Sequence, residues 1–198
     1  MIAGVLLASG ASARFGGDKL LAELDGRPVV RWSAEALAGV VDRLIVVVRD
    51  DAPAIRGALD GLAIQWVFNH DAERGMSTAI RAGIGALPPD TEAAVVALGD
   101  QPLVDRRVVG RLVARWRECG ARAVQPRYDD GRGHPVLFDA SLFPALCALE
   151  GDVGARAVLD TVGDALALLV VAGSRPADVD TPESLRALAA ALTRRGRD

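Results

Sequence analysis

The segment 7–19, Leu-Ala-Ser-Gly-Ala-Ser-Ala-Arg-Phe-Gly-Gly-Asp-Lys, follows an apolar run and is built mostly of small residues. Small residues let backbone N–H groups approach an anion, and Arg14 and Lys19 add two positive charges. The glycine spacing fits neither the Walker A pattern nor the dinucleotide fingerprint. The alternative is a flexible connection with solvated charges. We predict a phosphate-binding loop formed by Leu7, Ala8, Ser9, Gly10, Ser12, Arg14 and Lys19.

Two carboxylates are placed where a metal ion is often held. Asp100 directly follows an apolar run, and Asp180 precedes Thr181-Pro182, where Thr181 is a good helix N-cap and Pro182 suits the first helical position. Because Thr181 is available as the cap, Asp180 is free for another task. Asp100 could itself cap a helix beginning at Pro102, which is the common role of an Asp before a helix. If both carboxylates bind a metal, Mg²⁺ bridging to substrate phosphates is expected.

The elements that must position these residues are short apolar strands alternating with amphipathic helices, a pattern typical of an α/β fold with a mostly parallel sheet and right-handed crossovers. Ligands of such sheets bind at the carboxyl ends of the strands, where the loop and both carboxylates would lie. A turn-rich excursion from the main sheet is expected between Pro126 and Phe138. The predicted strands are 2–7, 43–48, 64–68, 93–98, 123–125 and 167–171.

Composition narrows the class of protein. The chain has 198 residues, 51% of them hydrophobic, which suits one α/β domain over residues 1–198. A formal net charge of −3 gives no global positive field, so we expect no nucleic-acid or membrane partner. Cys119 and Cys147 fall in helical apolar patterns and are expected to be buried in a reducing compartment. No basic leader precedes the first apolar run, so a cytoplasmic location is expected.

Six segments, in order, resemble the MobA-like nucleotidylyltransferases, and five of them resemble the molybdenum cofactor cytidylyltransferase branch. The resemblance implies a Rossmann-like fold with helices on both faces of the sheet, CTP and Mg²⁺ as co-substrate and metal, and a molybdopterin acceptor. It implies catalytic roles for Lys19, Arg14 and Asp100, metal ligation by Asp100 and Asp180, and substrate contacts by Gly75, Ser77, His134 and Asp152. The segments are 7–19, 75–78 (Gly-Met-Ser-Thr), 99–102 (Gly-Asp-Gln-Pro), 133–136 (Gly-His-Pro-Val), 151–156 (Gly-Asp-Val-Gly-Ala-Arg) and 178–183 (Asp-Val-Asp-Thr-Pro-Glu).

Some of these residues have plainer interpretations. Ser77 could be a helix N-cap, and His134 an ordinary loop histidine bonded to backbone. Asp152 and Arg156, four residues apart, could form a helical ion pair. Ser9 also departs from both branches, because the cytidylyl branch commonly has Ala there and the guanylyl branch Gly. The choice of base is therefore the least determined part of the prediction.

The predicted reaction is in-line attack by the terminal phosphate of molybdenum-bound molybdopterin on the α-phosphorus of CTP, releasing pyrophosphate. An ionised phosphate needs no general base, so the protein would supply positioning and neutralise charge. The same chemistry with GTP, or with a sugar 1-phosphate as acceptor, is the nearest alternative. A non-catalytic chaperone that holds the finished cofactor and docks onto a target molybdoenzyme is a third, and absence of the metal carboxylates would favour it.

Overall fold

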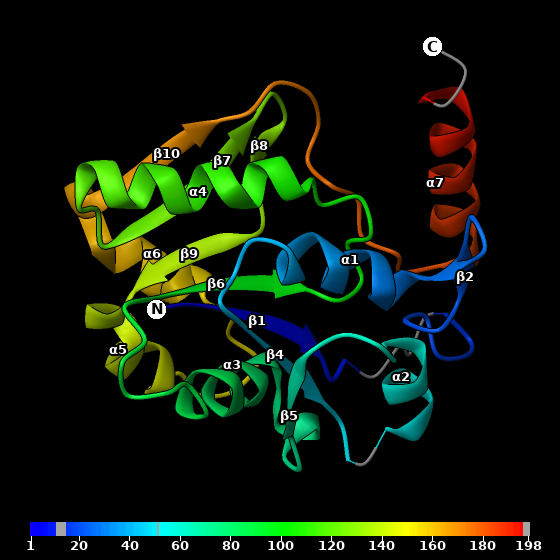
Figure 1. Ribbon diagram of the computed structural model, residues 1–198, viewed down its shortest axis with the longest axis horizontal. Helices are drawn as coiled ribbons and strands as arrows, with labels where there is room; N and C mark the ends of the chain where they lie inside the picture. The colour runs from blue at the N-terminus through cyan, green and yellow to red at the C-terminus, as the bar shows by residue number, and fades with distance from the viewer. Residues whose placement is uncertain (11–14, 51, 196–198) are drawn as a thin grey trace.

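The computed structural model describes residues 1–10, 15–50 and 52–195. These residues form a central sheet with helices on both faces (Figure 1). Within these residues the sheet has eight strands in the order β10-β7-β9-β6-β1-β4-β5, with β8 paired to β7. All the strand pairs are parallel except those that β9 makes with β6 and β7 and the one between β7 and β8. The strands are β1 (Ile2–Ala8), β4 (Arg43–Val48), β5 (Ile64–Phe68), β6 (Ala93–Leu98), β7 (Ala123–Tyr128), β8 (Gly131–Arg132), β9 (Val136–Asp139) and β10 (Leu166–Val170). The predicted mostly parallel α/β sheet is confirmed.

The helices divide into two layers. One apolar core lies between the sheet and α1 (Val29–Ala38), α2 (Pro53–Ala58) and α4 (Arg106–Cys119). The core on the other face is covered by α3 (Met76–Gly85), α5 (Phe143–Cys147) and α6 (Arg156–Val162). The short 3-10 helices η1 (Ala72–Arg74), η2 (Ala140–Leu142) and η3 (Gly163–Ala165) connect elements of this second layer.

A third, smaller apolar cluster lies beyond the edge of these layers. Helix α7 (Pro182–Arg195) stands apart from the sheet and packs near the two-stranded ribbon of β2 (Glu23–Leu24) and β3 (Arg27–Pro28) (Figure 1). Leu24, Val179 and Leu188 are buried in this cluster. The ribbon follows the segment that contains Lys19, and α7 follows Asp180, so this cluster fixes two of the predicted site residues from outside the sheet.

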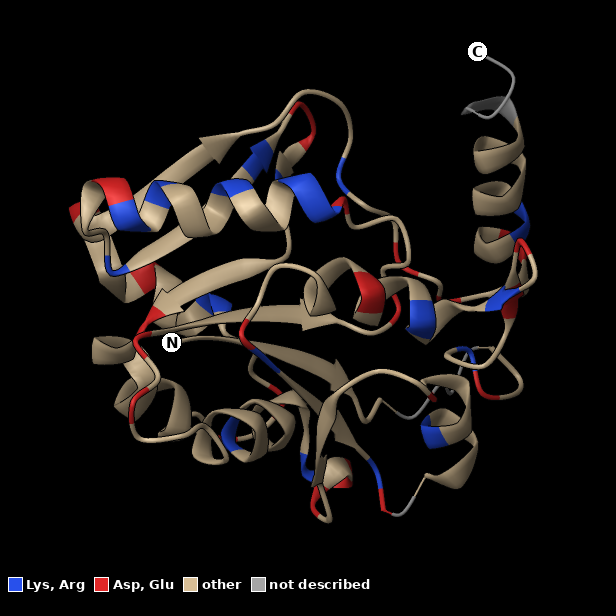
Figure 2. Ribbon diagram, in the orientation of Figure 1, with Lys and Arg blue, Asp and Glu red and all other residues tan. Residues whose placement is uncertain are grey.

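Continuous apolarity explains why the central strands are buried on both faces. Every residue of β4 after Arg43 is buried, and Ala93 to Ala97 of β6 are 0 or 1% exposed. Val and Ile suit a pleated, fully packed strand, and runs of this kind are typical of parallel strands covered by helices. Figure 2 shows β1 and β6 without charged residues, whereas charged residues of both signs lie on the helices and loops. No helix in the described part of the chain is long and apolar enough to cross a membrane.

Three sequence-based expectations are wrong. The segment from Pro126 to Phe138 does not leave the main sheet, because β7 and β9 are both strands of it and β9 lies between β7 and β6. The helix after Asp100 begins at Arg106 and not at Pro102, since the Asp105 side chain accepts a hydrogen bond from the amide of Arg107 and caps it. Both cysteines are exposed, because each is the last residue of its helix and does not lie on the face that packs against the sheet.

Candidate active site

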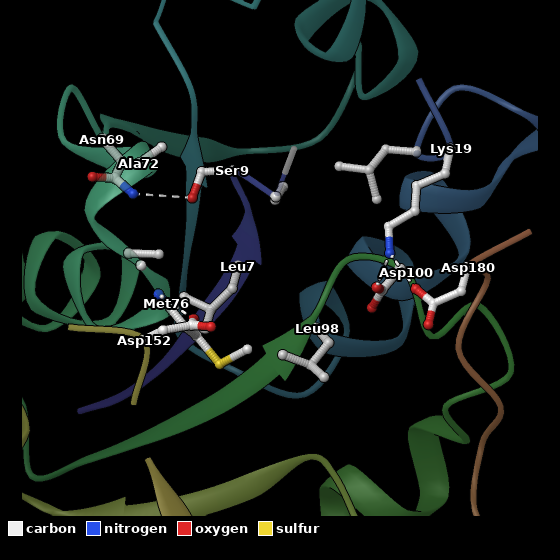
Figure 3. A pocket seen from close by; sticks show the side chains of 15 residues that line it. Leu7, Ser9, Lys19, Asn69, Ala72, Met76, Leu98, Asp100, Asp152 and Asp180 are labelled. Atoms are coloured by element: carbon white, nitrogen blue, oxygen red, sulfur yellow. Dashed lines mark hydrogen bonds and ion pairs between the residues drawn. The ribbon is translucent and has the colours of Figure 1, made fainter. Parts of the chain in front are cut away.

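A cavity of about 380 Å³ opens at the carboxyl ends of β1 and β6. Figure 3 shows its two ends: Ser9 and Asn69 lie on one side, and Lys19, Asp100 and Asp180 gather on the other. Between them lie Leu7 and Leu98. The position agrees with the rule that parallel sheets bind ligands at this edge. The cavity is lined by Leu7, Ala8, Ser9, Gly10, Lys19, Leu20, Asn69, Ala72, Gly75, Met76, Ala79, Leu98, Asp100, Asp152 and Asp180.

Lys19 joins the two predicted metal carboxylates. Its Nζ donates to Asp100 Oδ2 at 2.6 Å and to Asp180 Oδ1 at 2.9 Å, although these residues are 81 and 161 positions away in the sequence. The side chains of Lys19, Asp100 and Asp180 are 13, 20 and 36% exposed, so the cluster is largely shielded from water. Burial opposes charge on Lys19, but the hydrogen bonds and charges of the two carboxylates outweigh it and raise the pKa of its amine.

Local capping explains why both carboxylates are available. The helix after Asp100 is capped by Asp105, so Asp100 is not used as a cap. At the second site, Thr181 Oγ1 accepts from the amide of Ser184 at 3.2 Å, which confirms Thr181 as the capping residue of α7. Asp180 lies one residue outside that cap and turns its carboxylate toward Lys19.

The donor set fits a hard divalent cation that also binds substrate. Asp100 and Asp180 both accept from the Lys19 ammonium, so one oxygen of each carboxylate is directed at the same cation position. No group of three or more His, Cys, Asp or Glu residues suited to a metal occurs in residues 1–10, 15–50 and 52–195. Mg²⁺ is commonly bound by one or two carboxylates, and water and phosphate oxygens occupy its other coordination positions.

The far end of the cavity carries a polar network that sequence reasoning missed. Asn69 Nδ2 donates to Ser9 Oγ at 3.1 Å and to Thr78 Oγ1 at 3.0 Å. Asn69 is 4% exposed and Ser9 7%, so both are held in place by packing. Thr78 Oγ1 in turn donates to the carbonyl of Gly75 at 2.8 Å. The signal for Asn69 was its position directly after the strand 64–68, at the same edge of the sheet as Ser9.

The beginning of α3 is closed by a distant loop. The amide of Met76 donates to Asp152 Oδ1 at 3.3 Å, and the amide of Ser77 donates to the carbonyl of Gly151 at 3.3 Å. Asp152 therefore faces α3 and the cavity, and the ion pair with Arg156 is not formed. Ser77 is neither the N-cap, which is Gly75, nor a lining residue: its side chain is 0% exposed and its hydroxyl has no partner among the described residues.

A second cavity, of about 790 Å³, adjoins the first at Leu98, which lines both. It contains three arginines, of which Arg175 is anchored by two hydrogen bonds to the Asp130 carboxylate, from its amide at 2.9 Å and from Nε at 3.3 Å. These bonds lower the pKa of Asp130. The lining includes Gln101, Gln125, Asp130, Arg132, His134, Arg156, Asp160, Arg175 and Asp178.

Gln101, Asp178 and His134 form a polar part of the lining of the second cavity. Gln101 Nε2 donates to Asp178 Oδ1 at 2.8 Å. Partial burial raises the pKa of Asp178, against that hydrogen bond, and the charges of Asp100 and Asp180 raise it further. Burial lowers the pKa of His134, whose Nδ1 is enclosed without a hydrogen-bond partner in the described residues. His134 is thus a neutral group near pH 7.

The structure brings most of the predicted residues to one place. Leu7, Ala8, Ser9, Gly10 and Lys19 line the first cavity together with Gly75, Asp100, Asp152 and Asp180, and His134 lines the second. Ser12 and Arg14 lie outside the described residues. Asn69, Gln101 and Asp178 were not predicted as site residues.

A cavity at this edge of a mostly parallel sheet, with paired carboxylates and a lysine, is the arrangement expected of a nucleotidyltransferase. Residues 4–167 match the MobA-like NTP transferase domain, and the chain belongs to that family. This confirms the family inferred from the sequence motifs.

Three relatives show how varied the family is. The chain is 35% identical over 166 residues to a nicotine blue oxidoreductase of Paenarthrobacter nicotinovorans, covering 80% of this chain and 81% of the relative. It is 32% identical over 141 residues to a probable molybdenum cofactor guanylyltransferase of Thermococcus gammatolerans, covering 67% and 66%. The crystal structure of Rv0371c from Mycobacterium tuberculosis H37Rv superposes with a TM-score of 0.83 at 33% identity, covering 96% and 97%. That protein has also been solved in complex with manganese.

Proposed function

We propose that this protein transfers CMP from CTP to molybdenum-bound molybdopterin, with Mg²⁺, to give the cytosine dinucleotide form of the cofactor and pyrophosphate. The observation that carries the proposal is the cluster of Lys19, Asp100 and Asp180 beside the junction of two cavities. A transferase needs two substrates to meet at one charged centre. Asp100 lines the first cavity and its neighbour Gln101 lines the second.

The first cavity suits the nucleotide. Its small-residue loop end, Ala8 to Gly10, offers backbone amides, and Lys19 supplies a positive charge for a triphosphate. Mg²⁺ held by Asp100 and Asp180 would supply charge neutralisation at the phosphates. The manganese complex of Rv0371c supports a divalent metal in a protein of this family. Arg14 remains a proposed second cation of the loop.

The second cavity suits a phosphorylated acceptor. Arg132, Arg156 and Arg175 place guanidinium groups on its walls, and guanidinium is the side chain best matched to a phosphate group. His134, neutral near pH 7, and Gln101 add polar contacts for a heterocycle. The larger volume agrees with an acceptor bulkier than a sugar phosphate, which supports a pterin.

The preference for CTP rests on the segments that resemble the cytidylyl branch, and Ser9 offers a steric basis for it. Its hydroxyl is held by Asn69 at 3.1 Å, so its side chain is fixed against the cavity wall. A serine there leaves less room than a glycine, which disfavours a purine. The relationship to a probable guanylyltransferase makes GTP the competing nucleotide.

Oxidoreductase activity is the competing class of reaction, because one relative carries that name. Nucleotidylyl transfer and oxidoreduction can be distinguished by their products. The protein should be mixed with Mg²⁺, a molybdopterin source and each NTP in turn, and pyrophosphate release measured with and without the acceptor. Acceptor-dependent pyrophosphate release with CTP supports the proposal. Release with GTP alone would overturn the choice of nucleotide, and no acceptor-dependent release with any NTP would contradict nucleotidylyl transfer.

A further inference from the structure

Lys19 is the only lysine in the sequence, although the chain contains 23 Lys and Arg residues. An ammonium is a compact point charge with three donors, whereas a guanidinium is a wide planar fork. Between two convergent carboxylates, the compact charge occupies the position that a metal ion bound by both would take. The single lysine of the chain therefore lies where a compact positive charge fits between two carboxylates.

The ammonium lies where the two metal carboxylates converge. Nζ is 2.6 Å from Asp100 Oδ2 and 2.9 Å from Asp180 Oδ1, distances of charge-assisted hydrogen bonds. A cation that binds both oxygens must therefore compete with Lys19 for them. In a partly buried cluster, removal of the ammonium takes away a positive charge to which both carboxylates are hydrogen-bonded, which is unfavourable unless another cation replaces it.

We propose that Lys19 is the resident counterion of the metal carboxylates and is exchanged for the divalent cation when a triphosphate binds. A triphosphate in the first cavity offers the ammonium a denser negative charge on the same cavity wall. Its arrival draws the lysine toward the phosphates and exposes the carboxylates to the metal. This inference rests on the proposed function as far as Asp100 and Asp180 are the metal ligands.

The exchange has a thermodynamic consequence. If triphosphate binding removes a competitor of the metal, each ligand must strengthen the binding of the other by the same factor. The free protein should then bind a divalent cation weakly, and the triphosphate would set when the site is filled. Coordination of the metal by the triphosphate itself also contributes to this coupling, so the measurement that isolates the exchange is the metal affinity of the protein without nucleotide.

The first experiment measures Mn²⁺ binding without nucleotide, from the electron paramagnetic resonance signal of free Mn²⁺. Lys19→Met removes the ammonium and keeps the length of the side chain. We expect it to bind Mn²⁺ at least about tenfold more tightly than the wild type, since two carboxylates lose their competitor. Equal or weaker binding by a folded Lys19→Met protein would overturn the proposal.

The matched control is Arg43→Met. Arg43 is exposed at the beginning of β4, the edge of the sheet opposite the carboxyl ends, where Nη1 donates to Gln65 Oε1 at 3.1 Å. This variant loses the same single charge, so it measures the general effect of net charge on Mn²⁺ affinity. A gain in affinity equal to that of Lys19→Met would also overturn the proposal.

The second experiment uses the wild type and avoids any effect of substitution on folding. In protein labelled with ¹⁵N-lysine, the side-chain ammonium gives a single nuclear magnetic resonance signal. We expect metal-free tripolyphosphate, a probe independent of the base, to shift that signal, and millimolar Mg²⁺ alone to leave it nearly unchanged. Tripolyphosphate that binds by calorimetry without moving the signal would overturn the exchange.

The metal site and the exchange of Lys19 can be contradicted by different results. If Mn²⁺ binds the wild type with the non-hydrolysable α,β-methylene analogue of CTP but Lys19→Met gains nothing without nucleotide, the exchange is wrong and the metal site stands. If no variant binds Mn²⁺ under either condition, the assignment of Asp100 and Asp180 as ligands fails, and the exchange fails with it.

Discussion

The amide of Met76 and the carboxylate of Asp152 are joined by a hydrogen bond of 3.3 Å across 76 residues of sequence. The loop that carries Asp152 thereby closes the N-terminus of α3, where the backbone N–H groups lack partners within the helix. Gly75 makes the contact feasible. It has φ of 110°, and a Cβ there would lie 2.6 Å from the backbone of Gly151.

Gly75→Ala should therefore be destabilising and should reduce activity. The strained backbone and the clash together predict a loss of roughly 1–3 kcal/mol in the free energy of unfolding, measured by urea denaturation. The matched control is Gly110→Ala in the middle of α4, where a Cβ meets nothing within 4 Å. That change should stabilise by about 0.5–1 kcal/mol. A Gly75→Ala protein as stable as the control would show that the loop does not pack on α3 in this way.

Asp100→Asn should leave the fold intact and remove almost all turnover. The substitution preserves shape but removes the charge that would hold Mg²⁺, so we expect a fall of roughly 10³-fold in kcat/KM. Asp105→Asn is the control, because Asn caps a helix about as well as Asp and Asp105 does not line the first cavity. Similar activity of the two variants, at unchanged melting temperature, would remove Asp100 from the metal site.

Acidification should destabilise the protein in part through His134. Burial lowers its pKa below the ordinary value of 6.5, so the unfolded chain binds more protons than the folded protein in that range. The free energy of unfolding must then fall as the pH drops through about 6.5. His134→Gln should lose this part of the fall between about pH 7.5 and 5.5 in urea titrations. An unchanged pH dependence in the variant would mean that His134 titrates normally.

CTP should be preferred to GTP, as the segments nearest the acceptor indicate, and the Ser9 side chain should contribute by disfavouring guanine. One steric contact of this kind discriminates by about ten- to a few hundredfold in kcat/KM, and Ser9→Gly should narrow the gap. Ser9→Ala, which keeps Cβ but loses the bond to Asn69, separates size from hydrogen bonding. The two nucleotides should compete for one acceptor, with the dinucleotide products weighed by mass spectrometry. Excess guanylylated product from the wild type would reverse the base assignment.

Local sequence signals predicted the fold and part of the site well. The apolar runs gave the parallel strands, and Thr181-Pro182 correctly marked the beginning of α7, because capping depends on neighbours in the sequence. The same reasoning failed at Pro102, since Asp105 offered a second, equally local cap. It also missed β9 as a strand of the main sheet, because the place of a strand in a sheet depends on long-range pairing.

The contacts that define the site could not be predicted from the sequence, because they too join residues far apart in the chain. Lys19 meets Asp180 from 161 residues away, and Asn69 meets Ser9 from 60. Position at the carboxyl edge would have singled out Asn69, but only the fold shows that it holds Ser9. Ser77 illustrates the converse, because it is a motif residue in the first turn of α3 whose side chain is fully buried.

The central claim is that the nucleotide's α-phosphate moves to the acceptor. The most direct test supplies CTP labelled with ³²P at either the α- or the γ-position, together with protein, Mg²⁺ and molybdenum-bound molybdopterin. We predict that the α-label appears in the pterin dinucleotide and the γ-label in pyrophosphate. A γ-label on the pterin, or an α-label that stays in CTP while the acceptor is consumed, would contradict nucleotidylyl transfer.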